Sequence, residues 1–157
     1  MVSIDTILKN SLTSLVMGQD TDQERLFTLA DDLVKLTDEA WQQVLADRGQ
    51  LNHDIRLATY MAASRRWVQQ NDTAVSVGVV FAMWGEHIRL QARSLENPNG
   101  ENSLLNKVRQ LRWLTRDSAI TWTIYAVDDG DPEDSAAVAE NIVAEHGLEN
   151  DVTVLRK

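Results

Sequence analysis

Residues 120–155, ITWTIYAVDDGDPEDSAAVAENIVAEHGLENDVTVL, hold two strand-like segments with a helix-like segment between them. Residues 120–127 are rich in β-branched and aromatic side chains, which favour strands, and residues 151–155 are rich in β-branched side chains. Between them, alanine, valine and isoleucine recur at helical spacing as far as Gly147, a residue that commonly ends helices. This stretch predicts a β-α-β unit with parallel strands and a right-handed crossover.

The expected start of this helix is the Asp-Pro-Glu-Asp sequence at residues 131–134. Asp131 is suited to cap the helix, and Pro132 is suited to the first helical position. Glu133 and Asp134 would then lie in the first turn, where the helix dipole favours negative charge. We therefore expect the helix to run from Pro132 to Gly147.

A nearly unbroken apolar run, AVSVGVVFAM, occupies residues 74–83. Its valine content is typical of a strand buried on both faces of a parallel sheet. A polar loop at residues 94–103 and a segment with helical spacing at residues 104–114 follow it. The order β-α-β-α-β predicts an α/β fold with a parallel, Rossmann-like sheet. Because an exposed sheet edge invites pairing, we expect a homodimer or an edge covered by the N-terminal helices.

The part of the chain before this sheet has the pattern of a helical region. Apolar residues recur at helical spacing in four segments, at residues 4–18, 26–36, 37–49 and 54–70. Such faces usually pack into a core. Thr37, followed by two acidic residues, is typical of a helix N-cap. We therefore expect two domains, a helical region over residues 1–72 and an α/β unit over residues 73–157.

Composition excludes several classes of function. The chain has 157 residues, of which 24 are acidic and 15 basic, and its formal net charge is −9. This charge argues against a nucleic-acid coat or a binder of anionic membranes. The absence of cysteine excludes disulfides, thiolate metal sites and cysteine nucleophiles. No N-terminal signal pattern and no apolar run of roughly 18–20 residues is present, so we expect a soluble, cytoplasmic protein.

Polar residues follow two of the predicted strands where each strand ends. Trp84-Gly85-Glu86-His87 follows the first strand, and Asp128-Asp129-Gly130-Asp131 follows the second. Ligands of open parallel sheets bind beyond these carboxyl ends. Adjacent carboxylates need a partner there, such as a metal ion, a ring N–H, a ribose hydroxyl or an arginine. The alternative is a solvated Asp-Gly turn in which Asp131 only caps the helix.

These two stretches resemble a known family. Residues 127–135, VDDGDPEDS, resemble the VDDGSxDxS signature of family 2-type glycosyltransferases with the GT-A fold. Residues 81–86, FAMWGE, are similar to the first-strand pattern of that family, although Gly85 replaces its usual asparagine and Asp131 the usual serine of its signature. The resemblance covers residues 74–157 and implies the N-terminal, nucleotide-binding part of a nucleotide-sugar-dependent transferase, a partial GT-A unit.

The resemblance also implies a set of binding residues and a cofactor. Ala82 and Glu86 would line the nucleotide pocket, and Trp84 is placed to stack on a base or sugar. Asp128 and Asp129 would lie over the base and ribose of a UDP- or GDP-linked sugar, where a carboxylate accepts a uracil-type ring N–H. The longer parent enzyme would use Mn²⁺ or Mg²⁺, but its metal-binding D-x-D motif belongs after a fourth strand. Asp129-Gly130-Asp131 and Asp20-Thr21-Asp22 are D-x-D strings outside that place, so we expect no metal ligands and no complete catalytic site in these residues.

Several alternatives stay open. The chain could be a non-catalytic helical interaction or dimerisation module with an α/β scaffold. Its second half also resembles the first strand and acidic pair of a receiver domain, which binds magnesium there. Arg89 and Arg93 could contact a phosphate, pair with the strand-end acids, or lie as solvated surface residues. His87 could serve as a general base beside Glu86 or as a hydrogen-bonded structural residue.

Overall fold

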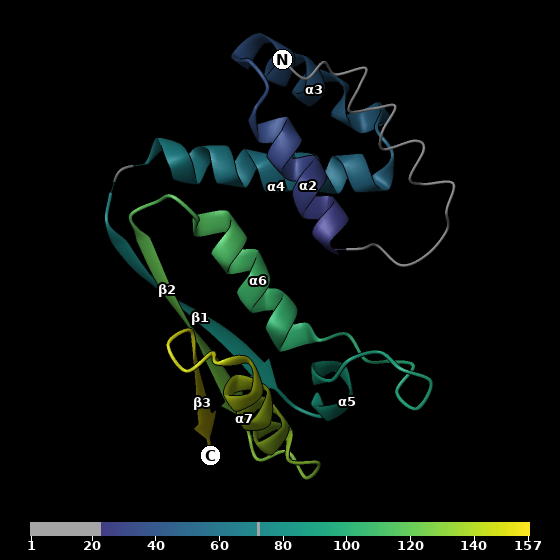
Figure 1. Cartoon of the computed structure of the whole chain (residues 1–157), viewed down its shortest axis with the longest axis vertical. Coiled ribbons are helices and arrows are strands. Elements are labelled where there is room, and N and C mark those ends of the chain that lie inside the picture. Colours follow the sequence, from purple (N-terminus) through teal and green to yellow (C-terminus); the bar gives the residue numbers. More distant parts are fainter. Residues whose placement is uncertain (1–22, 72) are drawn as a thin grey trace. The chain divides into compact units, whose positions relative to one another are not determined.

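The computed structural model describes residues 23–71 and 73–157 of the chain. The chain divides into two compact units, Met1–Asn71 and Asp72–Lys157. The described part of the first unit is helical, and the second unit contains a three-stranded parallel sheet with helices (Figure 1). The prediction of a mixed α/β chain is therefore confirmed. The helix predicted at residues 4–18, like Asp20 and Asp22, lies outside the described residues.

The helical unit contains three α-helices and a short 3-10 helix in its described part. These are α2 (Gln23–Val34), α3 (Asp38–Asp47), η1 (Arg48–Gln50) and α4 (His53–Gln70). The predicted N-cap of α3 is confirmed, because the Thr37 side chain accepts the N–H of Ala40. Asn52 caps α4 in the same way. In the part of the chain that the structure describes, none of the helices combines the length and the apolar character needed to cross a lipid bilayer.

Helices α2 and α4 pack through their apolar faces. Two arginines of α4 stabilise this packing. Arg65 is 2% exposed and lies 3.3 Å from the carboxylate of Asp31 on α2. Arg66 donates to the carbonyl oxygen of Leu36, beyond the end of α2, and stacks 5.3 Å from the ring centroid of Trp41. Because a buried guanidinium needs a partner, both arginines are structural residues of this unit.

The α/β unit follows the predicted element order. It contains β1 (Val75–Met83), α5 (His87–Leu90), α6 (Ser103–Thr115), β2 (Ile120–Asp128), α7 (Ser135–His146) and β3 (Val152–Arg156). The four-residue helix α5 was not predicted, because a single turn is too short to show a periodic pattern. The predicted start of α7 is wrong. Asp134, with a φ of 52°, is the N-cap, so Pro132 lies outside the helix.

All three strands are parallel and lie in the order β1-β2-β3. The strands contribute Val79, Phe81, Met83, Trp122, Ile124, Ala126, Val152 and Val154 to the core. Helices α6 and α7 contribute Leu104, Val108, Ala136, Ala139 and Val143 to the same core. Because these strand positions alternate, they share one face of the sheet, and both crossover helices cover that face (Figure 1).

The opposite face of the sheet carries no helix of the same unit. Val80 on β1 is 71% exposed, Tyr125 on β2 is 38% exposed and Leu155 on β3 is 43% exposed. The prediction that β1 is buried on both faces is therefore wrong. Its apolar run has the expected composition, but two crossovers that place their helices on one side leave the other side open. Among the described residues, β1 pairs with β2 alone, so it also has a free edge.

The polar segment between α5 and α6 has a fixed path. A Cβ atom at Gly100 would lie 2.3 Å from the carbonyl oxygen of Ala92, so only glycine allows this approach. The Asn97 side-chain amide donates to the carbonyl oxygens of Ile88 and Ala92. These contacts fix the position of α5 and of the residues that follow β1.

One pair of identical substitutions tests the difference between the two faces. Val152→Ala removes two methyl groups from a side chain that is 4% exposed in the core. We expect it to lower the free energy of unfolding by about 2 kcal/mol. Val80→Ala on the open face should change it by less than about 0.5 kcal/mol. Urea unfolding of dilute protein, with hydrogen exchange of the β2 and β3 amides, measures both. An equal loss of unfolding free energy at the two positions would contradict the conclusion that this face of the sheet is open.

Candidate functional site

The carboxyl ends of β1 and β2 lie at the same edge of the sheet. Met83 and Asp128 are the last paired residues of the two strands. The loop that begins at Trp84 therefore leaves the sheet beside the loop that begins at Asp129. The backbone N–H of Glu86 donates to the Ser135 hydroxyl oxygen at 3.0 Å and joins the two loops.

Asp128, a predicted base- and ribose-binding residue, shapes the turn after β2. Asp128 is 6% exposed, and its Oδ1 atom accepts the N–H groups of Gly130 and Asp131, both at 2.9 Å. Gly130 has a φ of +87°, a conformation that favours glycine. One oxygen of the Asp128 carboxylate thus accepts two backbone N–H groups and positions the turn.

Asp131 is the most strongly bonded acid of the site. Its carboxylate accepts the Glu133 N–H at 3.0 Å, the Ser135 N–H at 3.3 Å and the Ser135 hydroxyl in a short hydrogen bond. The Ser135 hydroxyl, aided by the Glu133 backbone, holds the pKa of Asp131 well below its usual range. The Ser135 hydroxyl oxygen also accepts the backbone N–H of Glu86. A continuous chain of hydrogen bonds therefore connects the end of β1 to the loop after β2.

The other predicted binding residues lie at different places around this edge. Ala82 is exposed on the open face, opposite Val127, away from the helix-covered side. Trp84 is 64% exposed beyond the end of β1. The Asp129 side chain is 75% exposed, with the Lys157 ammonium nitrogen 3.4 Å from its carboxylate. The structure thus brings Trp84 and Asp129 to one edge, both accessible to a ligand.

Glu86 and Arg89 form an ion pair at the start of α5. The two side chains are 3.0 Å apart, and the second partner of Arg89 is Glu101, also at 3.0 Å. These two acids raise the pKa of Arg89, and the largest cause is the hydrogen bond that Arg89 donates to Glu101. Arg93 donates from Nε to the carbonyl oxygen of Pro98. Of the alternatives for Arg89, pairing with the acids after β2 is not what the structure shows, because its partners Glu86 and Glu101 belong to its own segment.

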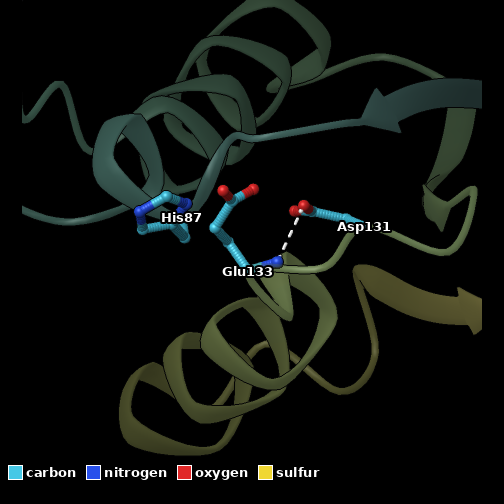
Figure 2. A group of neighbouring side chains, drawn as sticks. All are labelled: His87, Asp131 and Glu133. Carbon is cyan, nitrogen blue, oxygen red and sulfur yellow. Dashed lines mark hydrogen bonds between the residues drawn. The ribbon is translucent and has the colours of Figure 1, made fainter.

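A cluster that the sequence did not indicate consists of His87, Asp131 and Glu133 (Figure 2). One potential ligand atom from each residue lies within 4.8 Å of the other two. His87 comes from the start of α5, and the two acids come from the loop before α7. The Nδ1 atom of His87 is buried and has no hydrogen-bond partner. No short spacing joins His87 to the two acids in the chain, so only the strand register could have indicated that they meet.

The helical unit has a groove of about 400 Å³. It is lined by Asp38, Trp41, Gln42, Leu45, Ala63, Arg66, Trp67 and Gln70. Trp67 is 62% exposed, although it belongs to residues 54–70, whose apolar face is expected to pack into a core. The Arg66 guanidinium of the groove already donates to two backbone carbonyls and to Asp38, so its polar groups serve the fold.

Comparison with protein-family models, with curated proteins and with solved structures finds no match for this chain. The resemblance to glycosyltransferases therefore depends on the strand-end residues alone.

The hydrogen-bonded chain between the two loops can be tested at Ser135. The Ser135→Ala variant removes a fully buried hydroxyl and leaves the Glu86 N–H without its acceptor. We expect a loss of about 1–3 kcal/mol in the free energy of unfolding and faster hydrogen exchange of the Glu86 amide. Ser76→Ala, at an exposed position of β1, is the control and should stay within about 0.5 kcal/mol of the native protein. Unchanged exchange at Glu86 would contradict the bond.

Proposed function

We propose that the α/β unit binds a nucleoside diphosphate at the carboxyl ends of β1 and β2, as the nucleotide-binding part of a nucleotide-sugar-dependent glycosyltransferase. One observation carries the proposal. The turn after β2 uses the Oδ1 atom of Asp128, a buried residue, and leaves the carboxylate of Asp129 exposed, at the edge where parallel sheets bind ligands. The parallel order of the strands and the strand-end motifs support the same site.

The proposed roles differ among the acids after β2. Asp129 accepts the ring N–H of the base, because its carboxylate is the accessible one of the adjacent pair. Trp84, whose indole is largely exposed, offers an apolar face on which a base or sugar can stack. Asp128 acts through the turn that it holds, so it is a positioning residue. The substrate class is a pyrimidine or guanine nucleotide linked to a sugar.

Calorimetric titration of the full chain with UDP and with GDP, with and without Mn²⁺, tests this proposal. We expect measurable binding of one of the two. Asp129→Ala should weaken it by about tenfold or more, because it removes an acceptor from a desolvated ring N–H. Asp128→Asn should weaken it far less, since an asparagine oxygen can still accept the two N–H groups of the turn.

The control for Asp129→Ala is the same substitution at Asp47, an exposed position at the end of α3 in the other unit. This variant should bind like the native chain. Absence of heat with every nucleotide would overturn the proposal. Equal losses in the Asp47 and Asp129 variants would show that the heat does not come from binding at the strand ends.

A second candidate function is self-association through β1, favoured by the composition of its free edge. Residues 75–83 contain no charged side chain, although the whole chain has a net charge of −9. Free edges of this kind pair readily, and a charge on the strand opposes pairing. Light scattering over a concentration series should show a dimer that Val80→Lys weakens. A monomer at every concentration would exclude this function.

A further inference from the structure

We propose that His87, Asp131 and Glu133 form a binding site for a divalent transition-metal ion, Mn²⁺ or Zn²⁺. The site is independent of the proposed nucleotide binding, because it requires only side chains of this chain. In the described part of the chain, these residues are the one group of three potential ligands that lie this close together.

The geometry is close to that of a coordination shell. The three ligand atoms lie within 4.8 Å of one another. Ligands at about 2.1 Å from an octahedral ion are separated by about 3–4.2 Å, so small side-chain adjustments complete the arrangement. In Figure 2 the Glu133 carboxylate lies between His87 and Asp131, with one ring nitrogen of His87 turned toward it.

The unpaired nitrogen of His87 points to a ligand independently of the acids. Its Nδ1 atom is buried and has no hydrogen-bond partner, which is costly for a polar atom. Neutral imidazole has one nitrogen lone pair, and binding a metal ion is one of the commonest uses of that lone pair in proteins. The two carboxylates beside it repel one another, and a divalent cation would offset that repulsion.

Asp131 has the support that metal-binding carboxylates usually have. Ligating carboxylates are themselves hydrogen-bonded, which fixes their orientation. Asp131 receives such bonds from Ser135 and from the Glu133 backbone, and these hold it in place at the sheet edge. Glu133 is exposed, so it can move toward an ion without disturbing the core.

The mixture of ligands selects the class of metal. One imidazole and two carboxylates suit Mn²⁺ and Zn²⁺, whereas Mg²⁺ and Ca²⁺ favour sites made of oxygen alone. A chain without cysteine offers no thiolate to draw Zn²⁺ elsewhere. Three protein ligands would leave open positions for water or for an anionic oxygen of a second ligand.

Titration of the chelator-treated full chain with MnCl₂ and with ZnCl₂ tests the site. Calorimetry monitors both titrations, and loss of the free-ion electron paramagnetic resonance signal also monitors Mn²⁺ binding. We expect one ion per chain and weaker binding of Mg²⁺. The Glu133→Gln variant should weaken binding by about tenfold or more, since it removes a charged ligand from an exposed position that does not determine folding. His87→Ala should have the same effect, with circular dichroism to verify its fold.

The matched controls lie near the opposite end of the unit. Glu149→Gln and His146→Ala make equivalent changes at exposed positions close to the start of β3 and should leave the affinity unchanged. Absence of binding at millimolar Mn²⁺ and Zn²⁺ would overturn the proposal. So would binding that Glu133→Gln and Glu149→Gln weaken equally, because that result would mean general attraction of cations to an acidic chain. Since no nucleotide is present, either result is separate from the fate of the nucleotide proposal.

Discussion

The α/β unit depends on one topological constraint, the parallel alignment of three strands in chain order with both crossover helices on the same face of the sheet. This arrangement builds a core on one side only, between the strands and helices α6 and α7. It also brings the loops that follow β1 and β2 to a single edge. The apolar residues of the open face and the collection of polar residues at the strand ends are two consequences of the same constraint.

At that edge, the fold and the site use the same acidic residues. Asp128 and Asp131 accept backbone N–H groups that would otherwise be unsatisfied at the end of the sheet. Their burial is possible because each charge is hydrogen-bonded. Asp129 and Glu133, which alternate with them, remain exposed. An acidic sequence that resembles a single binding motif therefore contains both residues whose carboxylates hold the turn and residues that remain exposed to solvent.

Periodicity was sufficient to predict the main helices and all three strands, because their side chains repeat over many residues. It could not separate a strand buried on both faces from β1, since an apolar run has the same composition in either case. It also could not choose between Asp131 and Asp134 as the cap of α7, because both acids precede the same helical pattern. The cluster of His87 with Glu133 depends on strand register, which no local pattern contains.

Asp131 couples any ion at this edge to the folding of the unit. Its carboxylate ends the hydrogen-bonded chain that runs through Ser135 to the backbone of Glu86, so its position is correct only when the ends of β1 and β2 are joined. The neighbouring His87 is brought to it by the same junction. An unfolded chain would hold these residues apart and would bind an ion weakly. A ligand that prefers the folded state stabilises it in proportion to that preference. Metal binding at the cluster would therefore strengthen the junction that creates it, and the loops that follow β1 and β2 would become more rigid.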